Sequence, residues 1–163
     1  MHSHDHCCDH DHCEHKEHHH NHSQHHVEEA LEILKEAGYK HTNKRQRLVE
    51  ILNDANRYLS AKQVQELIAP EFPQLSYDTI YRNLYTFVQL NILEETEFNG
   101  EKLFRFRCQS HGHHHHFICE KCGSTKEIDM CPMDFFKEQL EGCEIHSHRF
   151  EIFGLCEKCA SKA

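Results

Sequence analysis

The sequence lacks any long hydrophobic run. No segment approaches the roughly 20 apolar residues that a membrane-spanning helix needs. Residues 2–6, His-Ser-His-Asp-His, offer no apolar stretch that could act as a secretory signal. We therefore expect a cytoplasmic protein that does not contact a membrane. Only 37% of the 163 residues are hydrophobic, which suits one domain or two small domains with modest cores.

The sequence also lacks an excess of positive charge. It has 18 Lys and Arg against 27 Asp and Glu, a formal net charge of -9, which argues against a general binder of polyanions. Contact with nucleic acid would therefore need a local basic patch. No nucleophile, base and orienting residue stand at an informative spacing, so an enzyme is the least favoured class of protein.

Cysteine and histidine are plentiful instead. Ten cysteines without a secretory signal favour metal binding or redox chemistry over structural disulfides, and 20 histidines favour metal. Residues 1–26 hold twelve of the histidines together with Cys7, Cys8 and Cys13. We expect this segment to be a disordered, metal-binding tail. A purification tag is the alternative, but such tags are usually contiguous histidines without cysteine.

The pattern of residues 27–107 predicts helices followed by a β-hairpin. Apolar residues recur at helical spacing after Val27, and three later helices each have a serine or threonine in position to cap them. These expected N-caps are Thr42, Ser60 and Ser76. Two strand-like runs then flank Asn99-Gly100, a strong signal for a tight turn. Together the elements predict a winged-helix domain.

Two features predict a DNA-binding face on this domain. The start of the second helix is basic, and the helix over residues 77–90 presents two tyrosines and an arginine opposite an apolar stripe that begins at Tyr77. We expect this helix to enter the major groove of double-stranded DNA; the alternative is a face that binds a protein partner. The candidate DNA contacts are Thr42, Lys44, Arg45, Arg47, Tyr81, Arg82 and Tyr85.

After residue 108, short strand patterns around a helix at 132–140 indicate a second, small α/β domain. Two C-x-x-C pairs in this domain predict a structural zinc site. The pairs are Cys119 with Cys122 and Cys156 with Cys159. Each offers two thiolates at zinc-knuckle spacing, and two such loops can close a tetrahedral site. A redox motif is the alternative for one pair, but two pairs without a thioredoxin-like context favour zinc. We expect the remaining Cys131 and Cys143 to be buried as small apolar residues.

The run from Cys108 to His116 is a candidate for a weaker, regulatory metal site between the two domains. Alternate residues of a strand point to opposite faces, so His114 and His116 can serve one site while His113 and His115 serve another. Cys108 would add a soft thiolate to the first set, which favours zinc over iron or manganese. A solvated histidine-rich loop is the alternative.

These motifs resemble those of the ferric uptake regulator family, and within it the zinc uptake regulators. The resemblance covers about residues 27–159 and rests on Thr42-x-x-Arg45, Leu75-Ser-Tyr-Asp-Thr-Ile-Tyr-Arg82-Asn-Leu, Gly100-Glu-Lys-Leu-Phe-Arg-Phe, the histidine run and both C-x-x-C pairs. It implies an α+β fold, with an N-terminal winged-helix DNA-binding domain (27–107) and a small α/β dimerisation domain (108–163). It also implies a homodimer that binds a near-palindromic operator and represses zinc-uptake genes when zinc is bound.

The resemblance further implies how the metal ligands are divided. The family's structural Zn²⁺ site corresponds to Cys119, Cys122, Cys156 and Cys159. The sensing ligands of the zinc regulators correspond to Glu94, Cys108, His114 and His116. A further site corresponds to His113, His115, Asp134 and His148, with Glu127 as the alternative acid. We therefore expect one structural and at least one regulatory Zn²⁺ per subunit.

Two rival functions stay open. Iron and peroxide sensors of the family commonly place a histidine just before the Ser-Ala that opens the third helix, whereas this chain has Arg57-Tyr58-Leu59 there, which favours zinc. An iron- or peroxide-responsive regulator of the same family is the nearest alternative. A protein of another class would buffer zinc through its histidine-rich tail.

Overall fold

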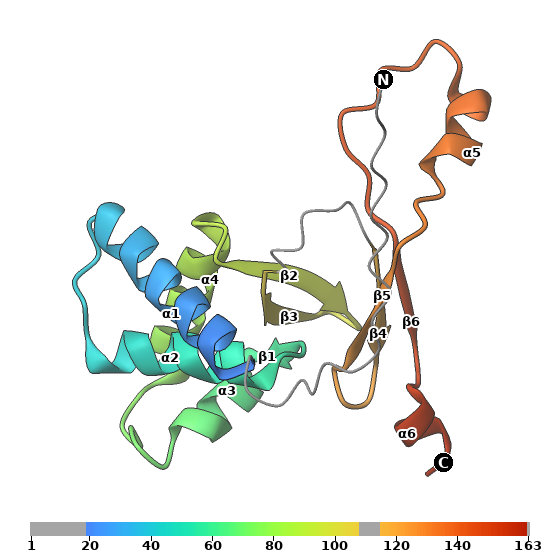
Figure 1. Ribbon diagram of the computed structural model, residues 1–163. Helices are drawn as coiled ribbons and strands as arrows, with labels where there is room; N and C mark the ends of the chain where they lie inside the picture. Colours follow the sequence, from blue (N-terminus) through green and yellow to red (C-terminus); the bar gives the residue numbers. More distant parts are fainter. Residues whose placement is uncertain (1–18, 108–114, 163) are drawn as a thin grey trace, which may run out of the picture.

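The chain folds into two lobes, and the computed structural model describes residues 19–107 and 115–162 (Figure 1). Side chains are described from Gln24 onward. The expected tail residues 1–18, and with them Cys7, Cys8 and Cys13, lie outside the described residues, as do Cys108, His113 and His114. None of the described helices is both long and apolar enough to cross a membrane.

Four helices make up most of the first lobe. They are α1 (His19–Glu36), α2 (Asn43–Ala55), α3 (Ala61–Ile68) and α4 (Tyr77–Gln89). The three predicted N-caps are confirmed, since the side chains of Thr42, Ser60 and Ser76 each accept a hydrogen bond from the backbone N–H three residues later. Helix α1 begins at His19 and not near Val27, so residues 19–26 are helical rather than part of a disordered tail.

A small sheet completes this lobe. Its strands are β1 (Leu59–Ser60), β2 (Leu93–Phe98) and β3 (Glu101–Phe106), in the order β1-β3-β2 with antiparallel pairing. Asn99 and Gly100 join β2 to β3 with φ of 51° and 77°. Left-handed backbone at both central residues suits a two-residue hairpin, so the predicted turn is confirmed. Helices followed by this hairpin give the predicted winged-helix architecture.

The core of the first lobe is built around the inner face of α4. Ile80, Leu84 and Phe87 are fully buried and belong to one hydrophobic cluster with side chains from α1, α2, α3 and the sheet. Tyr77 was expected on this face but is 50% exposed. It is the first residue of α4 and lies one turn before Ile80, where it stacks on Tyr81 with a 6.2 Å distance between ring centroids.

The second lobe has a three-stranded sheet and short helices. Its elements are β4 (His115–Cys119), β5 (Thr125–Ile128), α5 (Met133–Lys137), a 3₁₀ turn (Glu138–Leu140), β6 (Glu151–Gly154) and α6 (Glu157–Ala160). Strand β4 is central, antiparallel to β5 and parallel to β6. The helix predicted at 132–140 is therefore present as α5 and the turn that follows it.

The second lobe buries few side chains. Among its described apolar residues, Ile118 and Cys119 are fully buried, and α5 contributes no buried residue. The expectation that Cys131 and Cys143 are buried is wrong, because Cys131 is partly exposed and Cys143 is exposed. Both lie in the segment around α5, which has no core of its own to cover them.

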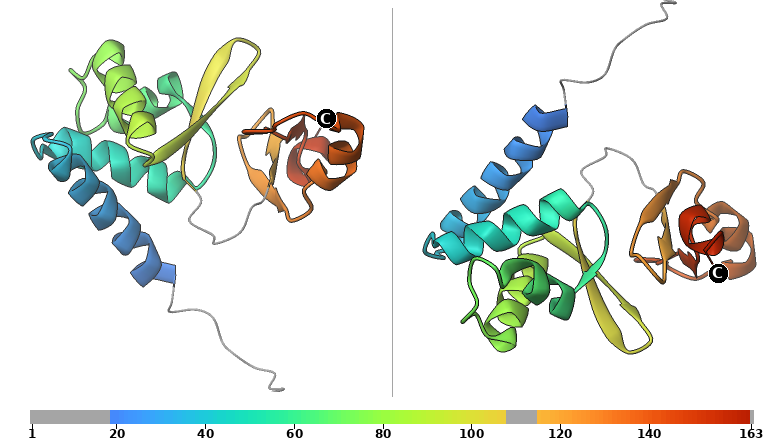
Figure 2. Two further views of the ribbon diagram at one scale, coloured as in Figure 1. Left: turned by 90° about the horizontal axis from the view of Figure 1, so that it is seen from above. Right: turned by 90° about the horizontal axis from the view of Figure 1, so that it is seen from below.

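The hairpin of the first lobe lies on the side that faces the sheet of the second lobe (Figures 1 and 2), and side chains connect the two. The Thr96 hydroxyl donates to the Glu151 carboxylate at 2.7 Å, and the rings of Phe98 and Phe153 stack with centroids 5.1 Å apart. On the other side of the junction, the Tyr58 N–H donates to the Gly123 carbonyl at 3.0 Å. The lobes thus meet through a few polar and aromatic contacts.

Candidate metal centres and nucleic-acid interface

The four cysteines of the C-x-x-C pairs come together in the second lobe. Their sulfurs all lie within 4.8 Å of one another, and the Cys122 and Cys156 sulfurs are 3.7 Å apart. A tetrahedral site with Zn–S bonds of about 2.3 Å has sulfur–sulfur edges of about 3.8 Å. Cys119 ends β4 and Cys156 precedes α6, so strand and helix termini position the ligands. The cluster has the size of a four-thiolate zinc site.

The environment of this cluster favours a thiolate at Cys119. Burial opposes ionisation of Cys119, but backbone N–H groups of Cys156, Cys122 and Lys121 outweigh it and lower the pKa of the thiol to about 6. The Cys156 N–H donates to the Cys119 sulfur at 3.3 Å. The pKa of Cys159 is instead raised to about 12, because the neighbouring Cys156 sulfur shares its proton. Four adjacent thiolates repel one another, and a dication would remove that repulsion.

Gly123 connects this cluster to the first lobe and allows a direct test of the junction. Its φ is +72°, and a Cβ built there would lie 2.2 Å from the Tyr58 carbonyl oxygen. We expect Gly123→Ala to lower the free energy of unfolding in two ways. An alanine in left-handed backbone costs about 1–2 kcal/mol, and loss of the Tyr58–Gly123 hydrogen bond costs about 1 kcal/mol or more. Gly100→Ala is the matched control, with φ of +77° and nothing within 4 Å. Equal losses of unfolding free energy in urea would contradict this role.

A second group of metal-binding side chains lies on one face of β4. His115, Cys131 and His148 offer ligand atoms within 4.8 Å of one another, and the Cys131 sulfur is 3.4 Å from His148 Nε2. We name these three residues the Cys131 cluster. It contains two of the predicted ligands of the further site, His115 and His148. Sequence reasoning missed Cys131, since a cysteine without a spaced partner carries no zinc-site signal.

The acids predicted for this further site lie outside the cluster. The side chain of Asp134 is 92% exposed and forms an ion pair with Lys137 at 2.9 Å, and hydrogen bonding to Lys137 lowers the pKa of that carboxyl group. Glu127 is exposed on β5, opposite His116. The geometry of the described residues therefore groups the histidines with a thiol and not with a carboxylate.

The regulatory set is only partly within the described residues. Glu94 lies on β2 of the first lobe and His116 on β4 of the second, where His116 is paired with Glu127 on one side and Glu151 on the other. His116 is buried, and Glu94 is partly buried. These two predicted ligands thus come from opposite sides of the junction between the lobes, as a site that fixes the lobes requires.

Tyr58 also lies at this junction, although it is not one of the predicted metal ligands. It is buried, and its hydroxyl donates to the Glu94 carboxylate at 3.2 Å. Burial, followed by the charges of Glu94 and Glu151, raises the pKa of the phenol well above its ordinary value. Tyr58 is therefore a neutral donor that positions Glu94, and the Arg105 guanidinium lies 3.7 Å from the same carboxylate oxygen.

Three of the candidate DNA contacts lie open on the first lobe. The Arg82 side chain on α4 is 79% exposed, with Asp78 at 3.0 Å one turn earlier. Tyr85 is 47% exposed one turn later, and Lys44 is exposed at the start of α2. These residues can reach a phosphate or a base edge without disturbing the core.

Arg45 and Thr42 are candidate DNA contacts that instead fix the start of α2 relative to α4. Arg45 donates from Nε to the Asn83 side chain at 3.1 Å and lies over the Tyr39 ring, 5.4 Å from its centroid. The Thr42 hydroxyl caps α2. Arg45 thereby ties the start of α2 to α4, which sets the position of Lys44 relative to α4.

The remaining two candidates are also engaged within the protein. Arg47 pairs with Glu71 at 2.6 Å and with Glu50 at 3.2 Å, so its charge is compensated locally. The hydrogen bond to Glu71 raises the pKa of Arg47. Tyr81 is partly buried and meets Phe104 edge to face. Fewer of the candidate DNA contacts are therefore available to DNA than the sequence predicts.

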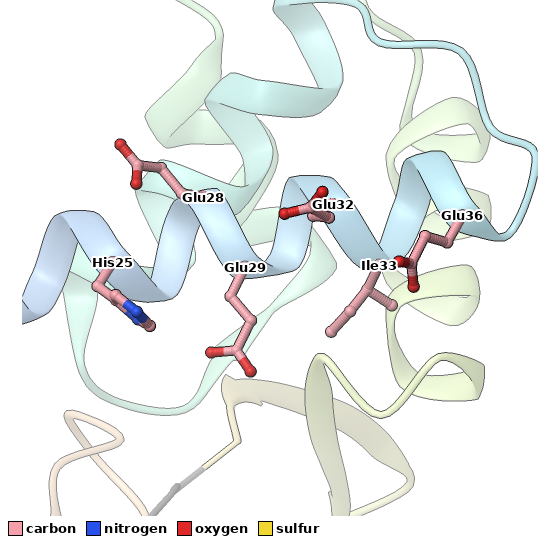
Figure 3. Close-up of a pocket in the computed structure, with 6 residues that line it drawn as sticks. All are labelled: His25, Glu28, Glu29, Glu32, Ile33 and Glu36. Carbon is pink, nitrogen blue, oxygen red and sulfur yellow. The ribbon is translucent and has the colours of Figure 1, made fainter.

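Helix α1 presents charge of the opposite sign. A hollow of about 430 Å³ along it is lined by His25, Ile33 and four glutamates (Figure 3). The glutamates are Glu28, Glu29, Glu32 and Glu36. Such a surface repels phosphates.

Residues 36–153 match the ferric uptake regulator family. The chain belongs to this family. Among its relatives is the ferric uptake regulation protein of Staphylococcus aureus, 48% identical over 133 residues that cover 82% of this chain and 97% of the relative. That of Staphylococcus epidermidis is 46% identical over 137 residues, covering 84% and 98%.

Solved structures of the ferric uptake regulator family share the fold. The Helicobacter pylori ferric uptake regulator has a TM-score of 0.65 at 20% identity, covering 85% of this chain and 93% of that one. A zinc uptake regulator in complex with zinc and DNA has a TM-score of 0.63 at 20% identity, covering 86% and 96%. Members of the family are metal-responsive transcription regulators and not enzymes, so this chain is such a regulator. The two sequence relatives are named for ferric uptake, and the zinc name comes from a solved structure that is 20% identical to this chain.

Proposed function

We propose that this regulator is a zinc-responsive repressor that binds a near-palindromic operator of zinc-uptake genes as a zinc-loaded homodimer. Tyr58 carries the choice of metal. It lies in the segment Arg57-Tyr58-Leu59, where the family resemblance places a histidine in iron and peroxide sensors, and its phenol donates to Glu94 instead of offering a nitrogen ligand. The junction site is then left to Glu94, Cys108, His114 and His116, and the Cys108 thiolate favours zinc.

The open face of the first lobe supports the DNA-binding part of the proposal. Lys44, Arg82 and Tyr85 are exposed on α2 and α4, while the acidic side of α1 would repel DNA. A helix of this kind can enter the major groove, with basic side chains on phosphates or guanine. A zinc uptake regulator that shares this fold has been solved in complex with zinc and DNA, which supports DNA binding by this chain.

The second lobe supports the homodimer. Large apolar side chains lie exposed in the single chain on α5, on the 3₁₀ turn after it and just before α6: Phe135, Phe136, Leu140 and Leu155. Apolar surface of this kind is typical of a surface that a second copy covers. A symmetric pair would present two α4 helices to two half-sites, which accounts for a near-palindromic operator.

In this proposal, the four-cysteine site stabilises the second lobe and the junction site acts as the sensor. Zinc at the junction would join Glu94 of the first lobe to His116 of the second and so fix the angle between the two α4 helices of a dimer. A coupling free energy of about 1–3 kcal/mol between zinc and operator would suffice, and operator DNA would then tighten zinc binding by the same factor.

Titrating operator binding with zinc, iron and manganese tests the metal response. We expect zinc to support binding at the lowest free concentration, and Cys108→Ser to lose zinc-dependent binding while the protein stays dimeric. Operator binding supported by iron and not by zinc would establish the iron-responsive alternative.

Deleting residues 2–18, which leaves α1 whole, should preserve repression. Loss of repression would favour the alternative in which the tail buffers zinc.

Arg82→Ala tests the DNA-binding face. We expect operator affinity to fall about 5- to 150-fold, because Arg82 would lose a contact to a base or phosphate worth about 1–3 kcal/mol. Lys35→Ala is the control, since Lys35 is an exposed basic residue in the last turn of the acidic helix α1. Equal losses for the two variants in a mobility-shift assay would argue against α4 as the recognition helix.

A further inference from the structure

The Cys131 cluster brings together three segments that are distant in sequence. His115 lies on β4, Cys131 lies just before α5, and His148 lies shortly before β6. The His115 and His148 rings have centroids 5.2 Å apart, and the Cys131 sulfur lies 3.4 Å from His148 Nε2. We propose that Cys131 is a thiolate ligand of a metal site completed by His115 and His148, and that this site takes Zn²⁺ in preference to Mn²⁺ or Fe²⁺.

The observed spacing fits a zinc ion. With Zn–N bonds of about 2.0–2.1 Å and a Zn–S bond of about 2.3 Å, tetrahedral geometry places a ligand nitrogen and sulfur about 3.6 Å apart. The distance from Cys131 to His148 is close to this value, and all three ligand atoms lie within 4.8 Å of one another. A metal ion therefore requires only small side-chain adjustments.

The cluster combines a fixed ligand with accessible ones. His115 is 5% exposed on the central strand of its sheet, and the Phe150 ring meets it edge to face with centroids 5.4 Å apart. Cys131 and His148 are partly exposed, which leaves a path for an ion to enter. Three protein ligands also leave a fourth coordination position for water or another side chain.

The donor set determines which metal is favoured. Two imidazoles and a thiolate form a softer set than two imidazoles and a carboxylate, and soft ligands favour zinc over manganese or ferrous iron. Asp134 is engaged with Lys137 and Glu127 is exposed on β5, and neither is among the residues that the described structure groups here. Cys131 is thus a specificity-determining residue of this site.

Metal binding here would also order the segment that carries α5. The ion would tie the residue before α5 to the central strand β4 and to the residue His148, in a region whose own side chains are largely exposed. Phe135 and Phe136 lie on that segment, so occupancy of the cluster would fix the apolar surface that we assign to the dimer. The inference depends on the proposed function only for this consequence and for the physiological metal.

Cobalt binding to the full-length chain tests the thiolate ligand. The background carries Cys7→Ser, Cys8→Ser, Cys13→Ser and Cys108→Ser and keeps zinc in the four-cysteine site, so that other thiols do not contribute. We expect Co²⁺ to produce a thiolate-to-cobalt charge-transfer band, which Cys131→Ser removes and Cys143→Ser preserves. Cys143 is the matched control, being an exposed cysteine of the same lobe. Zinc affinity, measured by competition with a chromophoric chelator, should fall more than about tenfold in Cys131→Ser.

Cys131→Asp separates a ligand role from a structural one. It should retain metal binding without the charge-transfer band and bind manganese more tightly relative to zinc. A band that survives in Cys131→Ser, or that is lost equally in Cys143→Ser, would overturn the proposal. So would loss of metal in Asp134→Ala with full binding in Cys131→Ser. These measurements need no DNA, so they stand apart from the operator assays that test the zinc-responsive function.

Discussion

Cys156→Ser is expected to unfold the second lobe and to remove one zinc ion per chain. Cys156 precedes α6, and its N–H and sulfur both contact the rest of the cluster. A structural zinc site contributes on the order of 10 kcal/mol, as much as the whole stability of a typical domain, about 5–15 kcal/mol. With Ile118 and Cys119 as the fully buried apolar residues of the described second lobe, hydrophobic burial cannot replace that contribution.

The loss should be visible as lower zinc content, reduced circular dichroism and dissociation of the dimer, with the first lobe still folded. The first lobe has its own core around Leu84 and Phe87, so thermal unfolding should show its transition unchanged. Cys143→Ser should keep full zinc content and the wild-type transitions. A Cys156→Ser protein that retains its zinc and its dimer would show that the four cysteines are not the structural site.

Local signals predicted the fold well because the interactions that produce it are local. Thr42, Ser60 and Ser76 cap their helices through hydrogen bonds to residues three positions later, and Asn99-Gly100 turns within a single hairpin. The C-x-x-C pairs are equally informative. Each places two sulfurs on one turn, so the chain needs only to bring the two turns together.

The ligands that depend on distant segments were harder to predict. Cys131 meets His115 and His148 only because β5, α5 and β6 return the chain to the same face of β4. Sequence spacing carries no record of that path, so the sequence predicts an acid beside these histidines, whereas the described structure groups them with a thiol. Tyr58 likewise interacts with a residue distant in sequence, Glu94 on β2.

The sequence also predicts side-chain exposure poorly, because it does not show which residues from other elements lie nearby. Arg47 belongs to a basic segment of the sequence, yet Glu50 and Glu71 compensate its charge, and Glu71 lies on a different part of the chain. Tyr77 follows the helical period of α4, but as the first residue of that helix it is half exposed and stacks on Tyr81. Periodicity identifies a face and does not define where the neighbouring elements end.

Phe135→Asp is expected to break the homodimer and, with it, operator binding. The Phe135 side chain is 68% exposed on α5 and packs edge to face on Phe136. A charge placed at the centre of an apolar interface should weaken association by about 2–4 kcal/mol, or roughly 30- to 1,000-fold. A monomer presents one α4 helix to one half-site, so affinity for a full operator should fall at least as steeply.

The control is Leu67→Asp, which places the same charge on another exposed apolar residue, 45% exposed on α3 of the first lobe. Sedimentation of the zinc-loaded proteins should show a monomer for Phe135→Asp and a dimer for Leu67→Asp. Because Phe135 lies far in sequence from every proposed DNA contact, loss of operator binding with monomer formation would tie DNA recognition to dimer geometry. If Phe135→Asp instead stays dimeric and binds the operator normally, the two copies meet through another surface, and the exposed side chains of α5 need a different partner.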